Sequence, residues 1–250
     1  MARVVGVHGA FHELWGPHQI AGRWIPALRD GLALAGTDVA ADQIAMAFYG
    51  DLFRPDPAVP LDDAALRDVA QRTGILDAAT QLVGADGLTA LVEQIGREQV
   101  RRTIAQLGRY FDDAAIRDAV RARVAAVIEP DTVVVVAHSL GSIVAYEVLA
   151  TQPGPARLDL VTIGSPLGHH AVVGADVEPA LQDGVGRWPP CVRRWTNITA
   201  VHDPVADGRP LAAVFPGVTE VRVDNGHRAH EPEPYLCARV TGVAIAAAMG

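Results

Sequence analysis

Short apolar runs alternate with helical patterns along most of this chain, and the clearest pair lies between Val133 and Glu147. Four consecutive valines at 133–136 form a β-branched run typical of strands that are buried on both faces of a parallel sheet. Apolar positions such as Val144 and Val148 then recur at helical spacing. The stretch is therefore expected to be a buried strand that leads through a short turn into a helix.

Other segments repeat this alternation of strand and helix. Helical spacing predicts helices at 18–35, where Pro26 could bend or divide the helix, and at 235–249. Strands alternating with helices predict an α/β fold with a mostly parallel sheet and helices on both faces, formed by one domain over residues 1–250. The further strands are expected at 3–7, 44–49, 158–163, 192–201 and 218–223.

Residues 55–128 have a different character from the rest of the chain. Three prolines open the segment, and no strand pattern follows them before the valine run. Because a crossover between parallel strands needs only one helix, this segment is expected to contain that helix and an inserted helical cap. Its helical patterns cover 61–72, 75–83, 88–111 and 114–128.

The turn after the valine run contains one of the three serines of the chain, Ser139; the others are Ser142 and Ser165. Small residues, Ala137 and Gly141, lie two positions before and after Ser139, where the strand and helix backbones must pass close together. On a sharp turn of this kind, the serine hydroxyl projects from the C-terminal edge of the sheet. The alternative is a packed strand–helix junction in which Ser139 caps the helix.

The sequence A-H-S-L-G at 137–141 resembles the nucleophile elbow G-x-S-x-G of the α/β-hydrolases, with Ala137 in place of the first glycine. The pair His8-Gly9, directly after the first strand, resembles the start of that family's oxyanion loop. The resemblance implies an α/β-hydrolase fold with Ser139 as nucleophile. It also implies an oxyanion hole formed by the N–H groups of Ala10 and Leu140, with Phe11 as the reserve donor.

The acid and the base of such a site are expected after later strands. Asp203 follows the strand at 192–201 in a D-P-V turn that resembles the family's acid position, and Asp207 is the reserve. Two histidines, His227 and His230, follow the last strand. His230 is preferred because lipase-like relatives carry this histidine a few residues before an aromatic residue that begins the last helix. Serine, acid and histidine then come in the family's chain order.

These residue types together suit acyl transfer. A serine hydroxyl needs a base to accept its proton, histidine titrates near neutral pH, and an aspartate can orient the imidazole. We therefore expect a lipase- or esterase-like serine hydrolase that cleaves a carboxylic ester through an acyl-enzyme on Ser139, with a hydrophobic small-molecule acyl substrate. The alternatives are a thioesterase, an acyltransferase or a ring-closing acyl enzyme of a biosynthetic pathway, and a binding protein without turnover.

Composition excludes several other classes of function. A net charge of −8 and a pI near 5.5 argue against a nucleic-acid partner. All basic residues apart from histidine are arginine, which excludes lysine Schiff-base chemistry and a P-loop lysine. Cys191 and Cys237 are too few for a disulfide framework, so free thiols are expected.

The remaining features concern cofactors and the membrane. His169-His170 lacks metal-ligand spacing, and neither a metal nor another cofactor is expected. The apolar runs are too short to form a transmembrane segment. The first strand begins almost at Met1, which leaves no room for a signal peptide and favours a cytoplasmic location.

Overall fold

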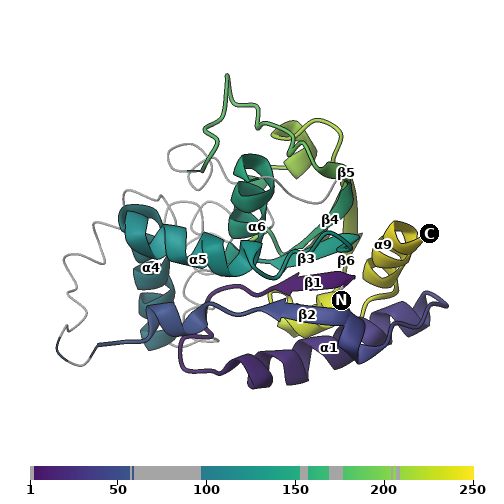
Figure 1. The fold of residues 1–250 in the computed structure, drawn as a ribbon, viewed down its shortest axis with the longest axis horizontal. Helices are drawn as coiled ribbons and strands as arrows, with labels where there is room; N and C mark the ends of the chain where they lie inside the picture. The colour runs from purple at the N-terminus through teal and green to yellow at the C-terminus, as the bar shows by residue number, and fades with distance from the viewer. Residues whose placement is uncertain are drawn as a thin grey trace.

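A computed structural model describes residues 3–56, 58, 97–152, 157–168, 177–203, 205–206 and 209–250. The described strands form one six-stranded sheet in the order β2-β1-β3-β4-β5-β6, and every neighbouring pair is parallel (Figure 1). The prediction of an α/β fold with a parallel sheet is therefore confirmed. The strands are β1 (Val4–Val7), β2 (Ile44–Ala47), β3 (Val134–His138), β4 (Leu158–Ile163), β5 (Val192–Ala200) and β6 (Thr219–Val223).

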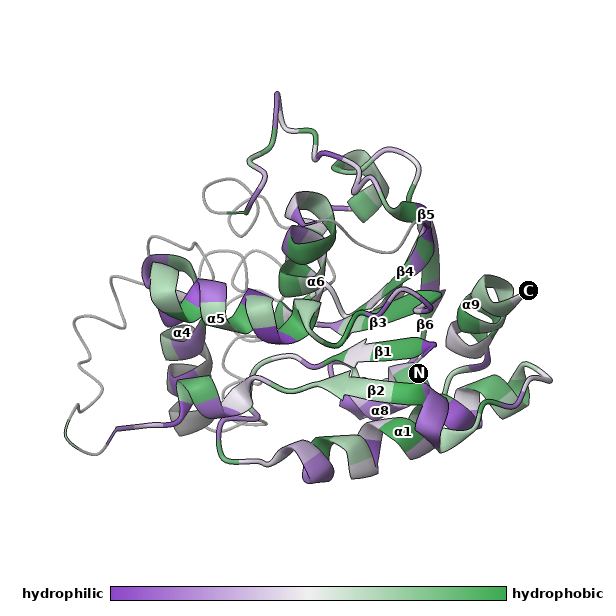
Figure 2. Ribbon diagram, in the orientation of Figure 1, coloured by the Kyte–Doolittle hydropathy of each residue, from purple (hydrophilic) through white to green (hydrophobic). Residues whose placement is uncertain are grey.

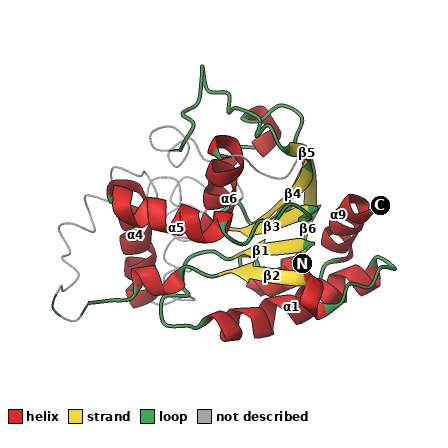
Figure 3. Ribbon diagram, in the orientation of Figure 1, coloured by secondary structure: helices red, strands yellow, loops and turns green. Residues whose placement is uncertain are grey.

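Helices cover both faces of the sheet (Figures 1 and 3). Helices α1 and α9 pack on one face, and α5 and α6 pack on the other. The α-helices of the described residues are α1 (Pro17–Leu34), α4 (Arg97–Asp112), α5 (Ala114–Ala125), α6 (Leu140–Thr151), α8 (Pro232–Leu236) and α9 (Arg239–Met249).

The valine run forms a central strand because both of its faces are buried. Side chains alternate across a strand, so Val135 and Ala137 join the apolar cluster under α5 and α6, while Val134 and Val136 join the cluster under α1 and α9. Figure 2 shows the resulting hydrophobic colour along the central strands. A strand in which apolar and polar residues alternate would have left one face of the sheet exposed to water.

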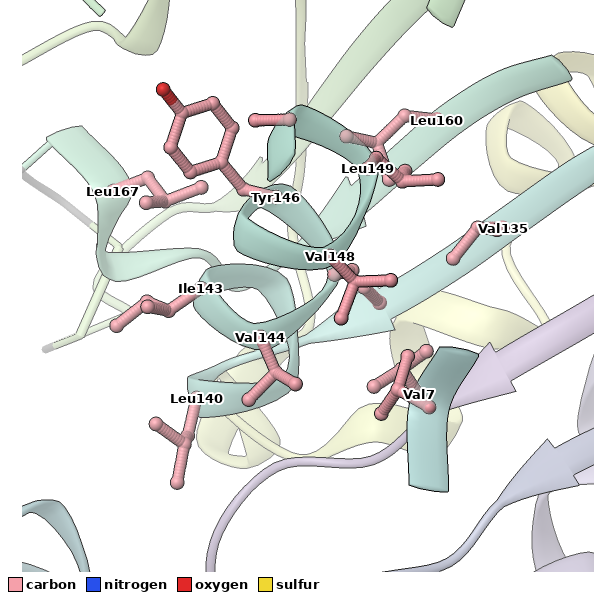
Figure 4. Packing of buried hydrophobic residues seen from close by; sticks show 14 of the residues in the cluster. Val7, Val135, Leu140, Ile143, Val144, Tyr146, Val148, Leu149, Leu160 and Leu167 are labelled. Carbon is pink, nitrogen blue, oxygen red and sulfur yellow. The ribbon is translucent and has the colours of Figure 1, made fainter. Parts of the chain in front are cut away.

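Helix α6 follows this strand and is buried along nearly its whole length. Every residue from Leu140 to Ala150 is buried, and its apolar side chains pack against β1, β3 and β4 (Figure 4). The one charged side chain in this helix, Glu147, accepts hydrogen bonds from Tyr110, Arg117 and Arg121 of α4 and α5. These contacts satisfy a buried carboxylate and attach α4 and α5 to α6.

The strand order determines where a site can form. From β1 the chain goes to β2 on one side, and it returns to β3 on the other side of β1. Loops after two adjacent strands that diverge in this way leave a crevice at the carboxyl ends of the strands, the usual ligand position in open α/β sheets. Here those loops begin at His8 and Ser139.

The helices differ from the sequence-based expectations in two places, and part of the expected insertion lies outside the described residues. The expected last helix is two helices, since the chain leaves α8 at Cys237 and enters α9 at Arg239. Helix α1 continues through Pro26 without division. Within the expected insertion α4 and α5 are present, whereas the helices expected at 61–72 and 75–83, and the start of the one at 88–111, lie outside the described residues.

Two further findings concern the cysteines and the membrane. Both cysteines are free thiols, as expected, with Cys191 buried and Cys237 half-buried. Over the residues that the structure describes, no helix combines the length and the apolar character needed to cross a bilayer.

The contact between α1 and α9 depends on a glycine at position 242. A methyl group on Gly242 would lie 1.9 Å from the carbonyl oxygen of Gly31, a backbone atom that cannot move aside. We expect Gly242→Ala to lower the free energy of unfolding by about 1–3 kcal/mol, measured by urea denaturation.

Gly22→Ala is the matched control, because Gly22 also lies within a helix but is exposed, with no atom within 4 Å of an added methyl group. It should raise the free energy of unfolding by about 0.5–1 kcal/mol. Equal changes in the two variants would contradict the close contact.

Candidate active site

Ser139 lies on a strained turn between β3 and α6. Its φ of 51° and ψ of −129° fall in a region that residues with a side chain rarely adopt. The Ser139 N–H donates to the carbonyl of Ile163 on β4, at 3.2 Å, which joins the turn to the neighbouring strand. The serine is therefore held at the carboxyl edge of the sheet in a conformation that local preference alone would not maintain.

Two glycines permit this turn. A methyl group on Gly141 would lie 2.3 Å from the carbonyl oxygen of His8, and one on Gly9 would lie 2.8 Å from the Cβ of Ser139. The loop after β1 and the turn after β3 are thus in backbone contact, and Gly141 is small because β1 and its loop pass beside it. Ala137 is fully buried in β3 and is accommodated without a glycine at that position.

The structure brings Ser139, His230 and Asp203 together. The Oγ of Ser139 lies 3.0 Å from Nε2 of His230, and Nδ1 of His230 lies 3.0 Å from Oδ2 and 2.9 Å from Oδ1 of Asp203. With Nδ1 protonated toward the carboxylate, Nε2 is free to accept the serine proton. His227 lies in the exposed turn at 226–228, so the ring between serine and aspartate is that of His230.

Asp203 is fully buried, and its carboxylate accepts hydrogen bonds from several donors. The N–H groups of Val205 and Ala206 donate to Oδ1 at 2.9 and 3.2 Å, and the hydroxyl of Tyr235 donates to Oδ2 at 2.5 Å. Burial alone would raise the pKa of Asp203, but the charge of His230 and the hydrogen bonds outweigh it, and the pKa lies below its usual value. The carboxylate is therefore ionised beside the imidazole.

His8 orients the loop that contains Ala10. Burial, together with nearby His12, lowers the pKa of His8 to about 3, so its ring is neutral. Its Nδ1 donates to the Gly9 carbonyl at 2.7 Å, and its Nε2 accepts from the N–H of Tyr49 at 3.3 Å. In a trans peptide the N–H points opposite to the carbonyl, so this bond directs the Ala10 N–H away from the His8 ring.

The other expected oxyanion donors differ in their contacts. Leu140 is the first residue of α6, so its N–H has no acceptor within the helix. The N–H of Phe11 donates to Oε1 of Gln106 at 3.3 Å, and Gln106 in turn donates to Glu13 at 2.6 Å. The reserve donor is therefore engaged by α4, whereas Ala10 and Leu140 stay the predicted pair.

The three serines form one hydrogen-bonded chain. The Oγ of Ser142 donates to the Ser139 carbonyl at 2.6 Å and lies 2.7 Å from the Oγ of Ser165, which accepts from the Leu167 N–H at 3.3 Å. Ser142 and Ser165 are both buried. They support the turn, and only Ser139 has a hydroxyl beside a histidine.

Besides Tyr235, two residues around His230 were missed from the sequence. The Nε2 of His138 donates to the carbonyl of His230 at 2.9 Å. Burial, and next the charge of His230, lowers the pKa of His138 well below its usual value, so this ring is a neutral donor. Gly164 has a φ of +54°, and a methyl group there would lie 3.1 Å from Oδ2 of Asp203 and 3.2 Å from Nδ1 of His230. In the sequence, Gly164 was visible as the first residue of a Gly-Ser-Pro turn that directly follows a strand.

The remaining candidate residues from the sequence are Asp207, His169 and His170, and all three lie outside the described residues. In the part of the chain that is described, no three His, Cys, Asp or Glu side chains are grouped so that they could hold a metal ion. A scan against models of protein families and a search of the curated proteins find no match to this chain.

The close fit around Gly164 leads to a test of the site geometry. We expect Gly164→Ala to push Asp203 and His230 apart, and so to remove the downfield proton NMR signal of the His230 Nδ1–H that this hydrogen bond produces. Gly36→Ala is the control, because Gly36 also has a positive φ, +78°, but no atom within 4 Å of an added methyl group. A signal that persists unchanged in Gly164→Ala would contradict the geometry.

Proposed function

We propose that this chain is a serine hydrolase of the α/β-hydrolase type that cleaves a carboxylic ester through an acyl-enzyme on Ser139. The observation that carries the proposal is the pair of hydrogen bonds joining Ser139 Oγ to His230 Nε2 and His230 Nδ1 to Asp203. A strained turn between strand and helix supports the same conclusion, because it is the context of a nucleophile elbow.

The proposed reaction begins with attack by Ser139 Oγ on the ester carbonyl. Its proton passes to Nε2 of His230, and Asp203 stabilises the imidazolium without taking the proton. The N–H groups of Leu140 and Ala10 stabilise the oxyanion, which collapses as His230 protonates the departing alcohol. Water, deprotonated by His230, then attacks the acyl-enzyme, and His230 returns this proton to the departing Oγ of Ser139 as the acid is released.

Burial supports these roles energetically. The Asp203 carboxylate is ionised and fully buried, so solvent screens its attraction for the imidazolium only weakly. The side chain of His230 is 17% exposed and that of Ser139 is half-buried, so both can reach a substrate. The nucleophile and base thus border solvent while the acid does not.

A fluorophosphonate probe tests the nucleophile. It should label the native protein at one site, and Ser139→Ala should abolish labelling, because the attacking oxygen is lost. Ser165→Ala is the control and should still be labelled at Ser139, since Ser165 lies in the supporting chain of hydroxyls. Labelling of Ser139→Ala, or of Ser165 in the native protein, would overturn the assignment.

A comparison of two histidine variants tests the base. His230→Ala should reduce kcat on nitrophenyl esters by about 10⁴-fold or more, as loss of a triad member does in serine hydrolases. His227→Ala should keep kcat within about threefold, an effect below 1 kcal/mol in activation free energy. Mild and equal losses in both variants would refute the role of His230.

A further inference from the structure

The hydroxyl of Tyr235 occupies a fixed position beside the acid of the site. It lies 2.5 Å from Oδ2 of Asp203 and 2.7 Å from the backbone nitrogen of Ala200 at the end of β5. Tyr235 is fully buried. The Ala200 N–H can only donate, and an ionised carboxylate can only accept, so the phenolic proton points at Asp203.

We infer that Tyr235 is a positioning residue of the proposed hydrolase, holding Asp203 in place and withdrawing charge from Oδ2, the carboxylate oxygen that is hydrogen-bonded to His230. The inference rests on the function proposed above. Its basis is that one oxygen, Oδ2 of Asp203, is within hydrogen-bond distance of both the Tyr235 hydroxyl and Nδ1 of His230. In this inference the Tyr235 hydroxyl acts on the reaction through Asp203.

The number of hydrogen-bond donors around the Asp203 carboxylate is about the number that it can accept. A carboxylate offers about four lone-pair positions, and the donors present are Val205, Ala206, Tyr235 and His230. Without the phenol, one of these positions loses its donor inside the protein. More negative charge then faces His230, which stabilises the imidazolium and strengthens its bond to the carboxylate.

The short segment from His230 to Tyr235 is anchored at both ends. His138 donates to the carbonyl of His230, and Thr241 donates through Oγ1 to the carbonyl of Tyr235 at 2.6 Å. Pro232 and Pro234 restrict the backbone between them. The base and the phenol are therefore placed against the same carboxylate by one constrained segment.

Tyr235→Phe tests the inference, because it removes the hydroxyl and keeps the ring. On a nitrophenyl ester, we expect kcat to fall about tenfold, because Asp203 loses one of the hydrogen bonds that hold it in place against His230, while KM changes less than about twofold. The acidic limb of the pH profile of kcat/KM should move to higher pH, because a more negative carboxylate favours the imidazolium. A role in folding alone would leave this limb in place.

Tyr146→Phe is the matched control. Tyr146 is also a buried tyrosine that donates one hydrogen bond, to the carbonyl of Arg187 at 3.1 Å, away from Asp203. Its pH profile should match that of the native protein. If Tyr235→Phe does not fold, 3-fluorotyrosine placed at position 235 supplies a more acidic phenol, and the acidic limb should then move to lower pH.

The NMR signal of the His230 Nδ1–H separates this inference from the proposed function. The signal should move downfield in Tyr235→Phe even if the protein hydrolyses no ester. Absence of turnover with this shift would refute the proposed function and leave the role of Tyr235 intact. An unchanged signal and an unchanged pH profile in folded Tyr235→Phe would refute the role of Tyr235 alone.

Discussion

The whole site depends on one close backbone contact, that between the loop after β1 and the turn after β3. Glycines at positions 9 and 141 allow the His8 carbonyl and the Ser139 turn to approach within distances that any side chain would prevent. This contact places the loop containing Ala10 beside Ser139. It also follows from the strand order, because β1 and β3 are neighbours although residues 8–133 separate them in the chain. The strained φ of Ser139 persists because packing on both sides determines it.

A second constraint is the burial of a charge. A carboxylate without exposure to water is stable only when its oxygens are hydrogen-bonded, and the donors around Asp203 come from the turn after β5, from α8 and from the histidine loop. The neighbouring His8 and His138 are neutral, since burial lowers the pKa of each. The ionised partner nearest to His230 is therefore Asp203, which suits stabilisation of one imidazolium.

Local patterns allowed much of the fold to be predicted, and contacts distant in sequence account for what was missed. The valine run and the spacing after Ser139 predicted β3 and α6, because both depend on side chains within a few residues. His138, Gly164 and Tyr235 were given no role, since each acts on a partner from another strand or loop. Glu147 lies within the helical pattern that predicted α6. Its buried ion pairs could not be predicted from that pattern, because they depend on Arg117 and Arg121 of α5. The break between α8 and α9 had no proline or glycine at Cys237–Ala238 to mark it.

The central claim is that a bond forms between Ser139 and an acyl group during turnover. Mixing the protein with a nitrophenyl ester, quenching in acid within the first turnover and determining the mass of each peptide would test it directly. The proposed function predicts the added mass of one acyl group on Ser139 and none in Ser139→Ala. Turnover without acylation, or an acyl group on a different residue, would contradict it.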